Sequence, residues 1–175
     1  MKKSLDLGCG KEPKNRFNAE VIIGIDLRDR NEENIFKADL VIQPIPFPDN
    51  HFDYVTAYDF IEHIPRVLYT PQRTHPFVEL MNEIYRVLNC DNGDGIFYSK
   101  TPCFSFAAAW RDPTHVNIIT EETFPLYFDN HNRWASMYGF KGAFEIIEQK
   151  IEGIHLETVL KKVPKAKISN QTIYD

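Results

Sequence analysis

Short apolar runs recur along the first hundred residues, each followed by a turn or by a helical segment. This rhythm is typical of strands that alternate with helices around a mostly parallel sheet. The runs predict strands at Ser4–Leu7, Val21–Asp26, Ile35–Leu40, Phe52–Tyr58 and Gly95–Lys100. The expected fold class is therefore α/β.

Two segments carry the spacing of helices. In Pro76–Leu88 the apolar residues repeat every three or four positions, which predicts an amphipathic helix that ends before the turn-rich Asn89–Gly95. A second helix is predicted at Glu121–Phe128, with Thr120 as its N-cap and acidic residues in its first turn.

The C-terminal part is predicted to form a hairpin. Phe144–Ile151 and Ile154–Val163 are both strand-like, and the two residues between them, Glu152 and Gly153, suit a tight turn. Residues 164–175 form a polar tail, and its lysines are read as solvated, not as a nucleic-acid contact. The 175 residues suit one domain, 1–175.

Charge and cysteine content exclude several classes of protein. The formal net charge of -5 gives no general attraction to nucleic acid or to an anionic membrane. Cys9, Cys90 and Cys103 are too few and too far apart for a disulfide framework or a metal knuckle, so we expect reduced thiols and no metal. With no signal-peptide core and no apolar run of about 20 residues, a cytoplasmic location is expected.

The strongest local signal is Leu5-Asp6-Leu7-Gly8-Cys9-Gly10, directly after the first strand. Glycines there either let the backbone approach a ligand or simply make a tight connection. The dinucleotide fingerprint requires a third glycine where this chain has Pro13, and the Asp6 carboxylate would repel a diphosphate. The motif therefore favours a ligand with an amino group over a pyrophosphate cofactor.

A carboxylate ends the second strand, in Gly24-Ile25-Asp26-Leu27. About 20 residues beyond a glycine turn, such a group is placed to accept hydrogen bonds from both hydroxyls of a ribose. The alternative is that Asp26 caps a helix. The ribose interpretation predicts a nucleoside cofactor without saying which one.

These motifs continue in order through Ala38-Asp39-Leu40, the stretch from Pro46 to Val55 with its Pro-Phe-Pro-Asp and Phe-Asp pairs, and Glu62-His63. In order and spacing they resemble the class I, Rossmann-like methyltransferases that use S-adenosylmethionine, and especially the small type 11 branch. The resemblance covers Ser4 to about Lys100, and more loosely the chain to Val163. It implies a doubly wound, mostly parallel seven-stranded sheet in three layers, α/β/α, that ends in an antiparallel hairpin.

The resemblance also implies roles for residues. Gly8, Cys9 and Gly10 would line the methionine part of the cofactor, with Asp6 under its ammonium group through water or a backbone amide. Asp26 would bind the ribose. Asp39 would address the adenine, although it is equally suited to a turn. Leu27 and Leu40 would be walls against the adenine ring, and Tyr58 and Asp59 would border the methyl group.

The chain departs from the family in two places. The segment between Gly10 and Val21 is short and contains Pro13, so the first helix is expected to be truncated or replaced by a loop. We expect no helices before the first strand to cover the substrate, so the site is expected to be open, covered by a second copy in a homodimer, or covered by internal segments. The internal candidates are 63–75 and the aromatic and charged stretch 102–117.

Methyl transfer needs no nucleophilic side chain, because positioning and desolvation supply much of the rate. His63, Asp59 and His115 are the candidates for a base or a substrate anchor. Hydrogen-bonded structural roles are the alternative for both histidines. The acceptor is expected to be a small molecule, and Asp112-Pro113-Thr114-His115 suggests by analogy a glycan-related one.

Other functions remain possible on the same pattern. A non-catalytic binding or scaffold protein would keep the fold and lose the cofactor. An oxidoreductase that uses NAD(P) is disfavoured by Pro13 and Asp6, and aminopropyl transfer is disfavoured by His63.

Overall fold

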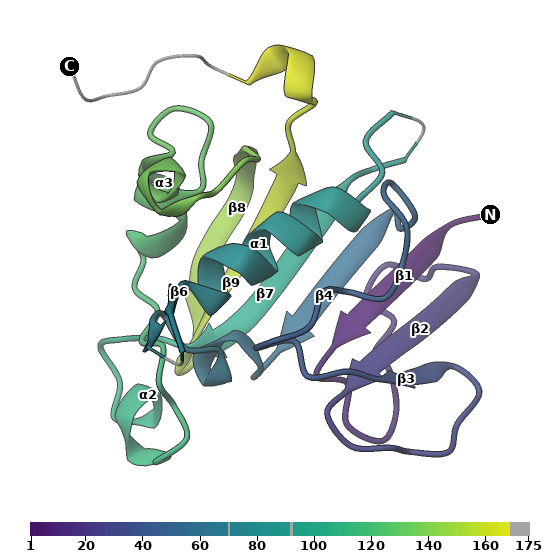
Figure 1. Cartoon of the computed structure of the whole chain (residues 1–175), viewed down its shortest axis with the longest axis horizontal. Coiled ribbons are helices and arrows are strands. Elements are labelled where there is room, and N and C mark those ends of the chain that lie inside the picture. The colour runs from purple at the N-terminus through teal and green to yellow at the C-terminus, as the bar shows by residue number, and fades with distance from the viewer. Residues whose placement is uncertain (70, 92, 169–175) are drawn as a thin grey trace.

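The structure is a computed structural model that describes residues 1–69, 71–91 and 93–168 (Figure 1). Its main sheet has seven strands in the order β3-β2-β1-β4-β7-β9-β8. Neighbours from β3 to β7 pair in parallel, and β9 pairs antiparallel with both β7 and β8. The strands are β1 (Lys3–Leu7), β2 (Val21–Asp26), β3 (Ile35–Lys37), β4 (Tyr54–Tyr58), β7 (Ile96–Pro102), β8 (Phe144–Glu152) and β9 (His155–Lys162). The predicted fold class is confirmed.

The helices are few and mostly short. They are α1 (Pro76–Val87), α2 (Ala108–Arg111) and α3 (Thr123–Tyr127), with 3-10 turns η1 (Ile61–His63), η2 (Trp134–Tyr138) and η3 (Lys165–Lys167). A two-stranded ribbon of β5 (Leu68–Tyr69) and β6 (Arg73–Thr74) precedes α1. Within the described residues, no helix has the length and apolar character needed to cross a membrane.

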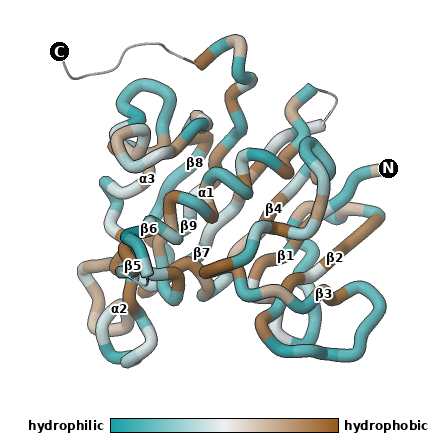
Figure 2. The backbone as a smooth tube through the Cα atoms, viewed as in Figure 1, coloured by the Kyte–Doolittle hydropathy of each residue, from teal (hydrophilic) through white to brown (hydrophobic). Residues whose placement is uncertain are grey.

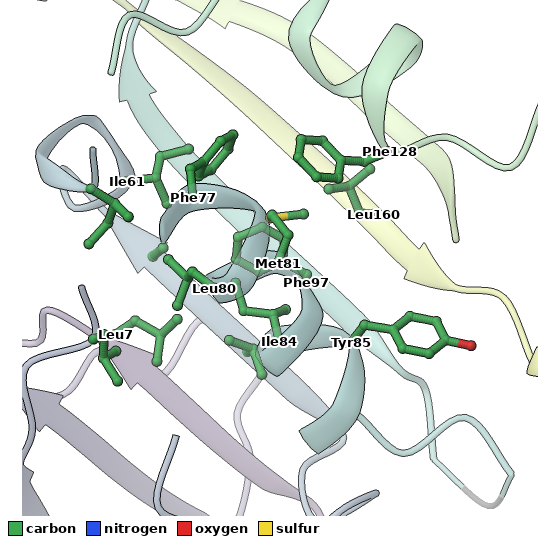
Figure 3. Close-up of a cluster of buried hydrophobic side chains, with 14 of the residues drawn as sticks. Leu7, Ile61, Phe77, Leu80, Met81, Ile84, Tyr85, Phe97, Phe128 and Leu160 are labelled. Carbon is green, nitrogen blue, oxygen red and sulfur yellow. The ribbon is translucent and has the colours of Figure 1, made fainter. Parts of the chain in front are cut away.

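One face of the sheet is closed by α1, whose apolar stripe is buried against the strands (Figure 3). Leu80, Met81 and Ile84 are at most 2% exposed and pack over Leu7 and Phe97. Pro76 at the first helical position has no N–H to leave unpaired, which explains why the helix begins there. The predicted period of three and four residues is therefore the buried face of this helix.

The opposite face is crossed by the segment between β1 and β2, which forms turns and no helix. Phe17 stacks on Tyr54 with ring centroids 4.5 Å apart. The Arg16 guanidinium lies 3.8 Å from the centroid of the Tyr98 ring, which is almost fully buried. The expected replacement of the first helix by a loop is confirmed, and aromatic and cation–π contacts hold that loop on the sheet.

Several predicted boundaries were wrong by a few residues. The third strand ends at Lys37 and not at Leu40, because the Asp39 carboxylate accepts a hydrogen bond from the Val41 N–H and turns the chain. The fourth strand begins at Tyr54, and Phe52 makes only an isolated bridge.

The two C-terminal predictions also needed correction. Helix α3 begins at Thr123 with Glu122 as its N-cap, because the Thr120 hydroxyl accepts from the Glu122 N–H in a preceding turn. The hairpin turns at Gly153 and Ile154, since Glu152 still pairs with His155 and Gly153 takes a φ of 62°. Of the predicted polar tail, η3 is described and residues 169–175 lie outside the described residues.

The carboxyl ends of the parallel strands meet at one edge of the sheet, the lower edge in Figure 1. The loops that follow β2, β4 and β7 gather there, and α2 belongs to this edge. Figure 2 shows apolar residues along β1, β2 and β4 and hydrophilic ones in the loop after β2. Ligands of open α/β sheets bind at this edge, the carboxyl edge.

The packing of α1 predicts a clear difference between two methionines. Met81→Ala removes a fully buried side chain and should lower the free energy of unfolding by about 2–5 kcal/mol. Met137→Ala, at a residue that is 51% exposed, should change it by less than about 0.5 kcal/mol. Urea denaturation of both variants measures this. Equal losses would contradict the described core.

Candidate functional site

The glycine motif leaves β1 at the carboxyl edge. Gly8 and Gly10 have φ of 65° and 68°, a region that glycine adopts without strain. A Cβ on Gly8 would collide with the Phe60 ring, whereas one on Gly10 would meet no atom within 4 Å. Gly8 is therefore needed for packing as well as for the turn, and Gly10 leaves open space beside the backbone.

Asp26 lies at the end of β2, directly beside this loop. Its Oδ2 accepts a hydrogen bond from the Gly10 N–H at 3.0 Å. Its Oδ1 accepts from the Arg28 N–H at 2.9 Å and from the Arg30 guanidinium at 3.2 Å. The structure thus brings the predicted glycine and ribose residues together, and adds Arg30, which the sequence analysis missed.

Asp6 is buried and its carboxylate is satisfied by the protein. One oxygen accepts from the Thr56 hydroxyl at 2.7 Å and the other from the Lys14 N–H at 2.8 Å. Burial raises the pKa of this carboxyl, and these two hydrogen bonds oppose the rise. Asp6 therefore fixes the loop that follows the glycines, and its place under the cofactor's ammonium group stays a prediction.

The Cys9 side chain packs against Gly24 of β2, a glycine to which the sequence alone assigns no role. A Cβ on Gly24 would collide with the Cys9 sulfur and lie 2.7 Å from the Pro13 ring. Gly24 is thus required because the loop lies against β2. Burial raises the pKa of the Cys9 thiol to about 11, with further contributions from Asp6 and Asp26.

The predicted adenine residues are not all at the surface. Leu27 is 62% exposed at the end of β2, and Asp39 is partly buried with one carboxylate oxygen in its turn. Leu40 is 7% exposed and belongs to the core cluster. Tyr58 lies on the face covered by the loop, with the Lys14 ammonium 4.2 Å from its ring centroid.

Asp59 stands immediately after β4 in a strained conformation. Its φ of 48° is unusual for a residue other than glycine, and such outliers concentrate at functional sites. The Asp59 Oδ1 lies 3.0 Å from the His155 Nε2 of β9. His155 is a missed residue, because it is 96 positions away and only the antiparallel insertion of β9 beside β7 brings it here.

His63 and His115 lie together. Their ring centroids are 4.9 Å apart, with the planes at 75°. The backbone holds them there, because the Val116 and Asn117 N–H groups both donate to the Glu62 carbonyl, at 2.9 and 3.0 Å. This long-range arrangement joins two residues that the sequence analysis proposed separately.

The aromatic stretch after β7 is partly exposed. Phe104 and Trp110 are 54% and 60% exposed, and their ring centroids lie 6.3 Å apart. A cavity of about 570 Å³ lies between α1, α3 and η2, and its lining includes Arg66, Phe77 and Trp134. None of the predicted cofactor or catalytic residues lines this cavity.

The family model described as a methyltransferase domain, of type 11, matches residues 5–93, just over half of the chain. The chain belongs to this family. The match contains the glycine motif, Asp26, Asp39 and Glu62-His63, which confirms the predicted family and its cofactor, S-adenosylmethionine. No curated protein matches this methyltransferase.

Solved structures share its fold. An S-adenosylmethionine-dependent methyltransferase from Archaeoglobus fulgidus is 18% identical, with a TM-score of 0.58 over 93% of this chain and 86% of that one. Another from Mesorhizobium loti is 14% identical, with a TM-score of 0.59 over 92% and 90%. A putative methyltransferase from Haloferax volcanii, in complex with its activator Trm112, is 13% identical, with a TM-score of 0.59 over 91% and 82%.

The raised pKa of Cys9 predicts an unreactive thiol between the two glycines of the motif. At pH 8 the folded protein should react with iodoacetamide at the partly exposed Cys90 well before Cys9. Peptide mass spectrometry over time measures the order, and the urea-unfolded chain should lose the difference. Fast labelling of Cys9 in the folded protein would show that the loop does not pack as described.

Proposed function

We propose that the chain transfers the methyl group of S-adenosylmethionine to a small-molecule acceptor, with glycan-related metabolites as the first class to test. The observation that carries the cofactor part is the hydrogen bond from the Gly10 N–H to the Asp26 carboxylate. It places the flexible glycine backbone and a carboxylate within one small region of the carboxyl edge.

The residues present fit this cofactor. Open space beside Gly10 and its positive φ permit close approach of a ligand to the backbone. The exposed Leu27 offers an apolar surface for an adenine ring, and Asp39 follows the end of β3 at the same edge. When bound, the cofactor supplies an electrophilic methyl carbon on a sulfonium.

Both hydroxyls of a ribose would need two acceptor positions on Asp26. Its Oδ1 already accepts from the Arg28 N–H and from the Arg30 guanidinium, so a bound diol would displace the Arg30 side chain and keep the backbone contacts. The bond from Gly10 to Oδ2 holds the carboxylate in place during this exchange. Arg30 thereby competes with the cofactor.

The acceptor side of the proposal rests on Asp59, His63 and His115. Asp59 follows β4 at the same edge, and its contact with His155 orients the carboxylate. A carboxylate or an imidazole there can bind an acceptor hydroxyl or amine and remove its proton. A second copy that covers this open edge, as a homodimer, remains a prediction.

Asp26→Ala should strongly weaken cofactor binding. We expect S-adenosylmethionine and S-adenosylhomocysteine to bind the purified protein with micromolar affinity, and Asp26→Ala to weaken both at least tenfold through loss of the ribose contacts. Isothermal titration measures this. Asp29→Ala is the matched control, because that carboxylate is exposed and, among the described residues, accepts a hydrogen bond only from the Asn31 N–H.

Two other outcomes would indicate different functions. In a parallel titration, binding of NAD(P)H with no binding of S-adenosylmethionine would indicate an oxidoreductase. A folded protein that binds neither would indicate a scaffold, a reading that Arg30 on Asp26 favours.

Asp59→Asn tests the acceptor side. Asparagine tolerates the positive φ but lacks the charge, so cofactor binding should persist while turnover of an acceptor found by screening falls about 100-fold or more. Formation of S-adenosylhomocysteine is the readout. Asp91→Asn, at an exposed and distant site, is the control, and equal turnover in both variants would exclude Asp59 from catalysis.

A further inference from the structure

Glu62, His63 and His115 form a cluster of metal-ligating side chains at the carboxyl edge. One ligand atom from each residue lies within 4.8 Å of the other two. Glu62 and His63 belong to η1 after β4, and His115 comes from the loop after α2. Two segments that are about 50 residues apart in sequence thus supply the cluster.

Hydrogen bonds to backbone carbonyls of η1 hold the two segments together, and none of these bonds uses a side chain of the cluster itself. Besides the two N–H groups that donate to the Glu62 carbonyl, the Asn117 side-chain amide donates to the Ile61 carbonyl at 3.0 Å. Asn117 is fully buried, and its Oδ1 accepts from the Arg66 guanidinium at 2.7 Å. The three candidate ligands are therefore held in place by the fold itself.

Both imidazoles are oriented by backbone carbonyls. The His63 Nδ1 lies 3.2 Å from the Thr114 carbonyl oxygen and 3.0 Å from the Thr114 hydroxyl, which donates its own hydrogen to the Asp112 carboxylate at 2.7 Å. The His115 Nδ1 lies 3.3 Å from the Ala109 carbonyl oxygen. A carbonyl only accepts, so in each ring Nδ1 carries the hydrogen and Nε2 keeps a lone pair. Histidines that bind metals are fixed in this way.

One oxygen of the buried Glu62 carboxylate has no hydrogen-bond partner among the described residues. The residue is 2% exposed, and its Oε2 accepts from the Thr101 hydroxyl at 2.9 Å. Its Oε1 is buried, and no described residue gives it a hydrogen bond. A buried carboxylate oxygen without a partner is costly, and a bound cation removes that cost.

We propose that Glu62, His63 and His115 bind a divalent transition-metal ion of the zinc class. Two imidazole nitrogens and one carboxylate oxygen suit such ions, whereas magnesium and calcium prefer oxygen ligands alone. Three protein ligands leave at least one coordination position open. At the carboxyl edge this position can take an oxygen of the acceptor, a role that rests on the proposed function.

The metal site is tested by titration of Zn²⁺ into the metal-depleted full-length protein. We expect about one equivalent to bind, and His63→Ala and His115→Ala each to weaken binding at least tenfold. His131→Ala is the matched control, because that histidine is highly exposed and its ring contacts only Asp129 among the described residues. Mg²⁺ should give no comparable heat.

Two further measurements keep the proposal falsifiable if an alanine variant is unstable. Glu62→Gln keeps the shape of the side chain and should also weaken Zn²⁺ binding at least tenfold. Co²⁺ bound to the wild type should show visible absorption bands, which His115→Gln should abolish. Zn²⁺ binding that is absent from the wild type, or equal in the wild type, Glu62→Gln and His115→Gln, would overturn the proposal.

Parallel titration of S-adenosylmethionine separates the two hypotheses. Cofactor binding without Zn²⁺ binding overturns the metal site and leaves the proposed function standing. Zn²⁺ binding without cofactor binding supports the site and removes its role in methyl transfer.

Discussion

The parallel pairing of β1 with β2 on one side and with β4 on the other is the constraint on which the candidate site depends. Leu7 pairs with Ile25 and with Ala57, so the three strands end at the same level. Gly8, Asp26 and Asp59 follow these ends and must therefore lie side by side. Apolar packing of α1 against the same strands fixes the edge, because Leu7 is fully buried beneath that helix.

The sequence predicts those parts of the fold and site that depend on local chemistry. The strands, α1 and the glycine turn follow from spacing within a few residues, and the positions of Gly10 and Asp26 follow from the order of the strands. Boundaries near Asp39 and Thr120 were misplaced, because their side chains bond to nearby backbone groups in ways that apolar periodicity does not encode. His155, Arg30 and the unpartnered oxygen of Glu62 depend on tertiary contacts, and no local signal announces them.

The loop between β1 and β2 shows how this chain manages without the family's first helix. Pro13, which in the sequence marks a departure from a dinucleotide motif and a shortened first helix, packs over Gly24. Lys14 and Arg16 lie over tyrosine rings of β4 and β7, and the N–H of Lys14 bonds to the buried Asp6. Contacts of this kind stabilise a short segment through a few fixed points, so the glycine motif keeps its shape without a helix behind it.

β9 lies between β7 and β8 in the sheet, so β7 has to wait for β9 to be translated before its second neighbour can pair with it. Asp59 is translated 96 residues before His155, its partner across the carboxyl edge. β7 ends at Pro102 and β9 begins at His155, so at about 5–20 residues per second the ribosome needs roughly 3–11 seconds to make the segment between them. During this time β7 has an unpaired lateral edge, which is a surface for association with other nascent chains. β9 thus brings His155 to the carboxyl edge and, by pairing with β7, also protects the nascent chain from aggregation.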